Sequence, residues 1–329
     1  MELGRRRFVA GSVAALFAQP GLVHAQVPGG TRRIVLLLAS NPAATSHWTK
    51  VLVAALAERG WIEGRNLYLD IRYAEGEAAR YRPLAAELLG TKPDVFVAGF
   101  EPIARQANSM TNTVPIVFAI GYDPVGNGLI QSFSRPGGNV TGVSILSYEL
   151  MPKRLSLLKE AVPSLSRVAV LYRRGDANAD RAIKLLADPA RTLGLSIVQA
   201  EVGEAAELGR VFEQIARQKA NGVMVVPDVL FFQHASRIFE LAIKYRLPSA
   251  FGTIEGASAG ALLSYSPDIA AAYRTLATLI DKILKGMRPA DLPVERLNVY
   301  ELVVNLKTAR RLGIKLPPTF LLQATQIIE

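Results

Sequence analysis

Short apolar segments alternate with helical patterns along this chain, and the alternation occurs twice in the same order. The segments that we predict as strands are RIVLLLAS (33–40), NLYLDIRYAE (66–75), DVFVAG (94–99) and PIVFAIG (115–121), then RVAVLYR (167–173), LSIVQAEV (195–202), GVMVVPD (222–228) and LPSAFG (247–252). The segments between them place apolar residues at i, i+3 and i+4, as with Trp48, Leu52 and Leu56, and this spacing predicts amphipathic helices. Strands that are apolar nearly throughout and joined by helices are typical of parallel sheets buried on both faces. The sequence therefore predicts an α/β protein with two doubly wound parallel-sheet lobes.

The chain does not end with the second set of strands. A further strand is predicted at 260–266, then a long helix that ends near Leu284 and another strand at 298–306. We therefore expect the chain to pass between the lobes more than once, through a hinge of several strands that bends without shearing the lobes apart. The two expected lobes comprise the ranges 31–143 with about 264–290, and 144–263 with about 291–329. We expect the polar, glycine-rich stretch 121–144 to be the first crossing between them.

Polar and aromatic side chains follow the predicted strands at their carboxyl ends. In open parallel sheets, ligands bind outside these ends. If the two lobes face each other, such residues line one cleft. The residues that we predict to bind a ligand there are Ser40, Phe100, Glu101, Tyr122, Asp123, Asp176, Asp228 and Glu255.

Two of these carboxylates also have a local structural interpretation. Glu101 precedes Pro102 near the start of a helix, so it either caps that helix in solvent or faces the cleft and takes a ligand ammonium group. Asp123 precedes Pro124 and either caps the turn through local backbone bonds or has a ligand or hinge role. The sequence leaves both alternatives open.

The composition excludes several kinds of reactive site. The chain has no cysteine, which excludes disulfides, zinc–thiolate sites and cysteine nucleophiles, and its three histidines have no metal-ligand spacing. GASAG (256–260) matches the G-x-S-x-G nucleophile elbow, but a strand is predicted after it and no histidine follows His234. No pair of carboxylates has a spacing that indicates acid–base catalysis. These observations favour a binding protein over an enzyme, and we expect neither a metal nor a cofactor.

The N-terminus is typical of an export signal. Arginines at positions 5, 6 and 7 precede an apolar run, and the small residue Ala25 closes the segment VHA. Arg5-Arg6-x-Phe8-Val9 also looks like a twin-arginine signal. We predict that residues 1–25 are an export signal cleaved near Ala25, and that the mature protein is periplasmic.

The formal net charge of +10 does not indicate a nucleic-acid partner. Lysines and arginines are scattered along the helical segments, with no basic run after the N-terminal arginines and no interleaved aromatic residues. No later segment is long and apolar enough to span a bilayer, so we do not expect the mature chain to be embedded in the membrane.

Several runs resemble one known family, and together they extend over nearly all of the mature chain in the family's order. These runs are WIEGRNLYLDIRYAEG (61–76), DPV (123–125), RPGGNVTGVS (135–144), GALLSYSPDIAAAYR (260–274), ILKGMRPADLPVE (283–295) and ELVVNLKTARRLGIKLPP (301–318). They resemble the periplasmic substrate-binding proteins of ABC importers related to tryptophan-binding proteins. The resemblance implies a type I periplasmic-binding fold that captures an amino acid or related small molecule and delivers it to a membrane permease of an ABC importer. The alternatives are a ligand-sensing domain for a membrane receptor and a small-molecule hydrolase. We expect the protein to be a monomer.

The chain departs from the family pattern at three of the expected site regions. One is the loop YRRGDANAD (172–180), where relatives usually have asparagines and prolines. Relatives usually have a Gly-Thr pair where this chain has Phe100 and Glu101. Relatives often have an arginine and an aromatic residue beside the glutamate that matches Glu255, and here its neighbours are Ile254 and Gly256. These differences favour a ligand with a cationic or hydroxylated end.

Overall fold

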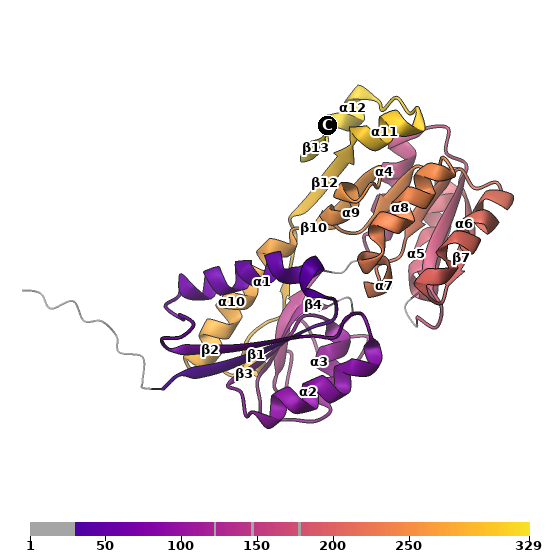
Figure 1. The fold of residues 1–329 in the computed structure, drawn as a ribbon. Coiled ribbons are helices and arrows are strands. Elements are labelled where there is room, and N and C mark those ends of the chain that lie inside the picture. Colours follow the sequence, from indigo (N-terminus) through magenta and orange to yellow (C-terminus); the bar gives the residue numbers. More distant parts are fainter. Residues whose placement is uncertain (1–29, 122, 146–147, 177–178) are drawn as a thin grey trace, which may run out of the picture. The chain divides into compact units, whose positions relative to one another are not determined.

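The computed structural model describes residues 30–121, 123–145, 148–176 and 179–329. The predicted export signal and Tyr122 therefore lie outside the described residues. Two separate sheets organise the described chain (Figure 1).

The first sheet has six strands, and every pair in it is parallel. In spatial order its strands are β11 (Glu295–Arg296), β5 (Val140–Ser144), β4 (Ile116–Gly121), β3 (Val95–Ala98), β1 (Arg32–Leu38) and β2 (Leu67–Tyr73). Its helices are α1 (Pro42–Ala57), the 3₁₀ turn η1 (Ala78–Arg80), α2 (Tyr81–Gly90), α3 (Glu101–Asn108), α10 (Ile269–Leu284) and the 3₁₀ turn η3 (Pro289–Asp291). We call this sheet and its helices the first lobe.

The second sheet has seven strands, and within it only β10 and β12 are antiparallel among the described pairs. In spatial order its strands are β13 (Gln326–Ile328), β12 (Tyr300–Asn305), β10 (Leu263–Pro267), β9 (Ser249–Phe251), β8 (Gly222–Val225), β6 (Arg167–Arg173) and β7 (Ser196–Val202). Its helices are α4 (Met151–Ala161), α5 (Ala179–Thr192), η2 (Ala205–Glu207), α6 (Leu208–Arg217), α7 (Val229–Gln233), α8 (Ala235–Lys244), α9 (Ile254–Ser258), α11 (Leu306–Leu312) and α12 (Pro318–Leu321). We call this sheet and its helices the second lobe.

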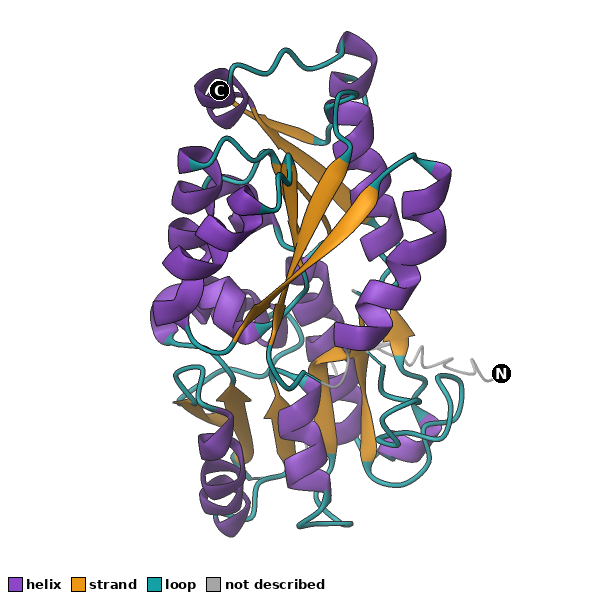
Figure 2. Cartoon of the chain, turned by 90° about the vertical axis from the view of Figure 1, so that its right-hand side faces the viewer, coloured by secondary structure: helices purple, strands orange, loops and turns teal. Residues whose placement is uncertain are grey.

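Each sheet is covered by helices on both faces, which follows from the alternation of side chains along a strand. In β1, Ile34 and Leu36 pack into a core with α1 and α10, whereas Val35 and Leu37 pack on the opposite face with α2 and α3. The second sheet is sandwiched in the same way (Figure 2). The predicted α/β class with two doubly wound parallel sheets is confirmed.

The stretch 121–144 is not a crossing between the lobes, so this prediction was wrong. Its last five residues form β5, all of them buried, and β5 pairs with β4 in the first sheet. Leu129 and Ile130 pack into the core of the same lobe. The glycines permit the turns that return the chain, because Gly128 and Gly137 both have positive φ. The chain first leaves the lobe after β5.

The later crossings lie a few residues from the predicted limits. Ser264–Pro267, expected in the first lobe, belongs to β10 of the second sheet, where it pairs with β12. Glu295–Arg296, expected in the second lobe, pairs with β5 at the edge of the first sheet. The long helix α10 between them packs against α1 in the first lobe.

Candidate ligand-binding site

A mainly apolar cavity of about 80 Å³ lies where strand ends of both lobes meet, and we call it the first cavity. Trp48 of α1 stands in its wall between Phe232 of α7 and Tyr273 of α10. The Trp48 ring lies 5.5 Å from the Phe232 ring and 6.0 Å from the Tyr273 ring, both nearly parallel to it. Because Phe232 comes from the second lobe, this aromatic stack connects the two lobes and forms an apolar surface for a ligand.

Two hydroxyl groups in the first cavity have unused hydrogen-bonding capacity. Ser40 follows β1 and Thr253 follows β9, so the parallel strands place them at carboxyl ends of different sheets. The Ser40 Oγ and Thr253 Oγ1 atoms are buried and have no hydrogen-bond partner among the described residues. Thr253 is the N-cap residue of α9, yet its side chain makes no capping bond. Buried polar atoms are normally paired, so these two hydroxyls are available to a ligand.

Asp228 lies just past β8, at the N-cap of α7, and lines the first cavity. Its Oδ1 accepts a hydrogen bond of 2.7 Å from the Leu230 backbone N–H and lies 3.5 Å from Arg173 Nη1. Burial raises the pKa of Asp228, while the Leu230 hydrogen bond and the positive charge of Arg173 act in the opposite direction. The structure therefore places a costly buried carboxylate where a ligand would lie.

A larger and more polar cavity of about 440 Å³ adjoins the first, and we call it the second cavity. It is also lined by Asp228, together with Tyr81 and Arg105 of the first lobe and Arg173 of the second. Burial, with a smaller effect of the Asp228 charge, raises the pKa of Tyr81 to about 12, so its hydroxyl stays protonated at neutral pH. Asp176, one of the predicted binding residues, lines this second cavity.

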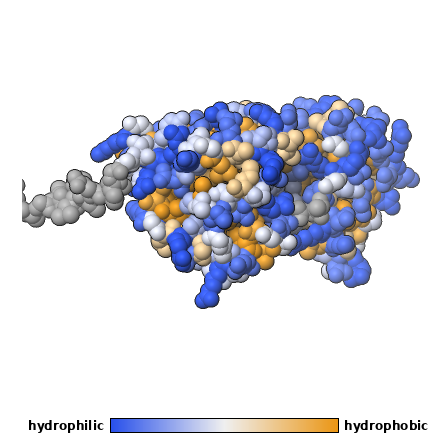
Figure 3. Space-filling model, turned by 90° about the horizontal axis from the view of Figure 1, so that it is seen from below, coloured by the Kyte–Doolittle hydropathy of each residue, from blue (hydrophilic) through white to orange (hydrophobic). Residues whose placement is uncertain are grey.

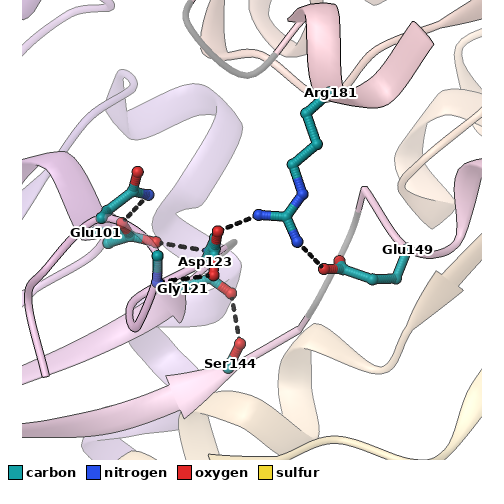
Figure 4. Close-up of polar contacts among 8 residues, drawn as sticks. Glu101, Gly121, Asp123, Ser144, Glu149 and Arg181 are labelled. Carbon is teal, nitrogen blue, oxygen red and sulfur yellow. Dashed lines mark hydrogen bonds and ion pairs between the residues drawn. The ribbon is translucent and has the colours of Figure 1, made fainter. Parts of the chain in front are cut away.

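Glu101 lines the second cavity, but its carboxylate is already hydrogen-bonded within the first lobe (Figure 4). Its Oε2 accepts a 3.0 Å bond from the Asp123 backbone N–H, and its Oε1 accepts a 2.6 Å bond from Asn127 Nδ2. Only 2% of Glu101 is exposed. These contacts favour the structural alternative for Glu101, which holds the turn after β4.

Asp123 caps its own turn and also contacts the second lobe (Figure 4). Its Oδ1 accepts a 3.1 Å bond from the Gly126 backbone N–H, and its Oδ2 pairs with Arg181 of α5. The same guanidinium donates to Glu149 at 2.9 Å, just before α4. Asp123 lines neither cavity, and it contacts the opposite lobe through Arg181.

Glu255 also connects the lobes and lines neither cavity. Its Oε1 lies 3.3 Å from His47 Nε2 of α1, whereas its Oε2 is buried with no hydrogen-bond partner among the described residues. Of the other predicted residues, the structure brings Ser40, Phe100 and Asp228 together in the first cavity.

The sequence analysis missed four residues that line the first cavity: Trp48, Phe232, Thr253 and Tyr273. Trp48 and Tyr273 lie on helices, whereas the prediction considered residues at strand ends. The spacing of Trp48 from Leu52 and Leu56 was interpreted as that of a buried helix face. Thr253 lies two residues past the end of β9, so the strand-end rule could have found it.

The described residues contain no cluster of three or more His, Asp or Glu side chains that could hold a metal ion. None of their helices has the length and apolarity needed to cross a membrane. On the face drawn in Figure 3, hydrophilic residues are spread widely, and apolar residues form separate patches between them.

Comparison with known proteins gives a consistent assignment. Among solved structures, a conserved domain protein from Vibrio cholerae is 29% identical with a TM-score of 0.84, covering 91% of this chain and 100% of that one. An ABC domain from Streptococcus pneumoniae in complex with L-Trp is 24% identical with a TM-score of 0.83, at the same coverages, and supports the fold. A tyrosine-binding protein of Clostridioides difficile is 25% identical over 266 residues, which are 81% of this chain and 76% of that protein.

A family model described as ABC transporter substrate binding protein matches residues 35–328, almost the whole described chain. A protein that captures a small solute needs two lobes with a cavity between them. This chain has two α/β lobes, and the first cavity lies between their strand ends. The chain belongs to the ABC transporter substrate-binding protein family, whose members capture a solute for an importer.

Proposed function

We propose that this protein captures an amino acid or a closely related small solute in the first cavity and delivers it to the membrane permease of an ABC importer. The observation that carries the proposal is the pair of unpartnered hydroxyls, Ser40 and Thr253, which lie in one aromatic-lined cavity with Asp228. The tyrosine-binding relative supports an amino-acid ligand. We further propose that the protein is exported, is cleaved near Ala25 and acts as a monomer.

Each polar group of the first cavity suits one part of an amino acid. The Ser40 and Thr253 hydroxyls can donate to a carboxylate, and Asp228 can accept from an ammonium group. An ammonium group beside Asp228 would supply the opposite charge that favours its ionised form despite burial. An apolar side chain would lie against Trp48 and Phe232. These roles are binding roles, so we propose that no bond of the solute is broken.

The ligand contacts both lobes in this arrangement, because Ser40 and Trp48 belong to the first and Asp228 and Thr253 to the second. A ligand that contacts both lobes favours the conformations in which they lie together. This coupling would let the permease distinguish loaded from empty protein.

Asp228→Asn tests the proposed site. We expect it to weaken binding of the cognate amino acid about tenfold or more, because a hydrogen bond to a charged group is lost. Asparagine can still cap α7 through its side-chain oxygen, so the fold should persist. Thermal-shift screening of the mature chain against amino acids finds the ligand, and titration calorimetry measures each affinity.

Asp188→Asn is the matched control, since Asp188 lies on the exposed surface of α5 with an 82% exposed side chain. It should leave the affinity unchanged. Equal affinities of wild-type protein and Asp228→Asn for a ligand that binds the mature chain would refute this placement of the site.

A further inference from the structure

The first cavity is too small to hold an aromatic amino acid by itself. Its volume is about 80 Å³. A protein cavity that accommodates benzene measures roughly 150 Å³. A ligand of amino-acid size must therefore extend out of the first cavity in this conformation.

The second cavity adjoins the first. Both are lined by Phe100, Pro227, Asp228 and Val229, so the two spaces border on the Asp228 side chain. A ligand nitrogen that donates to Asp228 would lie at this junction, and an acylated nitrogen keeps one N–H for this bond but loses the positive charge of an ammonium group. Any substituent on that nitrogen would point into the second cavity, which has a volume of about 440 Å³.

Two carboxylates of the second cavity already have donors. Both oxygens of Glu101 accept hydrogen bonds, and Asp228 accepts from Leu230 and faces Arg173. Asp176 is the remaining carboxylate of the lining, and its Oδ2 is buried.

Two donors of the second cavity are unused. Arg105, an exposed residue near the end of α3, has no ion-pair or hydrogen-bond partner among the described residues, and neither does the Tyr81 hydroxyl. A guanidinium group can donate two parallel hydrogen bonds to a carboxylate. The burial of Tyr81 keeps its hydroxyl a donor at neutral pH. These two donors are suited to an anionic group.

We propose that the second cavity binds a carboxylate carried on an acyl extension of the ligand's nitrogen, with Arg105 and Tyr81 as its donors. The favoured substrate class is an amino acid whose nitrogen bears an acidic acyl group, as in an acidic dipeptide or an N-succinyl amino acid. This inference rests on the proposed function, because it assumes that the apolar part of the ligand occupies the first cavity.

The test uses three forms of the same amino acid on the mature chain: free, N-acetyl and N-succinyl, prepared for both leucine and phenylalanine. Titration calorimetry should show that an N-succinyl form binds about two- to fivefold more tightly than its N-acetyl form, because only the former offers a charged acceptor to the exposed Arg105 guanidinium. Arg105→Gln should reduce this ratio to near one. Arg217→Gln is the matched control, since Arg217 is an exposed arginine in the last turn of α6 outside both cavities, and it should leave the ratio intact.

The outcomes separate the two proposals. If the free amino acid binds and the N-succinyl form binds no better than the N-acetyl form, the second-cavity proposal is overturned while the proposed function stands. If the N-succinyl form is preferred equally by wild-type protein and Arg105→Gln, the extension is recognised elsewhere and the proposal is again overturned. If none of these forms binds and the thermal-shift screen finds no amino acid that binds the mature chain, the proposed function itself fails.

Discussion

At the scale of single residues, similar carboxylates have different roles because their surroundings differ. Glu101 and Asp123 are bonded to donors of the turn after β4, and they stabilise that turn. Asp228 lines two cavities and is largely buried. The Leu230 hydrogen bond and the Arg173 charge do not offset the effect of burial, so its pKa is raised. The sequence identified all three as strand-end acids, but it could not show which donors the folded chain would bring to each of them.

The raised pKa of Asp228 has a consequence for stability. A group whose pKa is raised on folding stabilises the folded state when protonated, and this contribution is lost as the pH rises through the folded-state pKa. Asp228→Asn resembles the protonated form, so the ligand-free variant should melt a few degrees higher than wild-type protein at pH 7. The difference should shrink as the pH is lowered toward the ordinary range of aspartate. Melting curves from pH 4 to pH 8 measure it, and a variant that is less stable throughout would contradict this explanation.

At the scale of elements, the sequence predicted most strands and helices, and its main error concerned one connection. Strand β1 was recognisable because its buried residues form a continuous apolar run in the sequence. Helix α1 was recognisable because its buried residues recur with the spacing of an amphipathic helix. The stretch after β4 was interpreted as an interlobe crossing because its glycines and polar residues resemble a linker. The pairing of β5 with β4 depends on contacts between distant segments, which local composition does not encode. The cavity-lining aromatic residues of α1, α7 and α10 were missed for the same reason.

Helix α5 contributes an electrostatic contact between the lobes, in which Arg181 pairs with Asp123 and Glu149 (Figure 4). Exposed ion pairs each contribute about 0.2–1 kcal/mol, so Arg181→Gln should weaken ligand binding about two- to fivefold. The loss should diminish as salt is added, because screening weakens the wild-type contact. Arg191→Gln on the same helix removes only a local pair with Asp188, and it should have no effect on affinity. Titrations at low and high ionic strength distinguish these variants, and equal affinities at low salt would argue against the contact's role.

At the scale of the whole molecule, the lobes are coupled through the aromatic stack of Trp48, Phe232 and Tyr273. The chain has two tryptophans, and the other, Trp61, is buried in the first lobe, where its indole donates to Asp281. The indole at Trp48 therefore reports on the cavity, whereas that at Trp61 reports on the interior of one lobe.

In Trp61→Phe, ligand binding should change the wavelength and intensity of the remaining emission, because Trp48 lines the cavity. The variant should lose about 1 kcal/mol of stability with its hydrogen bond, a loss that a denaturant titration can verify. In Trp48→Phe, the same ligand should produce a much smaller change. A ligand-dependent signal that persists in full without Trp48 would show that the emission reports on another part of the molecule.

Helix α10 belongs to the core of the first lobe, although the strands next to it in sequence, β10 and β12, belong to the second. During synthesis, the ribosome releases α10 only after most second-lobe strands have emerged. The side of β4 and β5 on which α10 packs must therefore remain uncovered until that helix arrives, which runs against the usual order in which N-terminal domains fold first. Neither lobe can be produced as one uninterrupted fragment of the chain. A nascent chain stalled before Ile269 therefore lacks a helix of the first lobe.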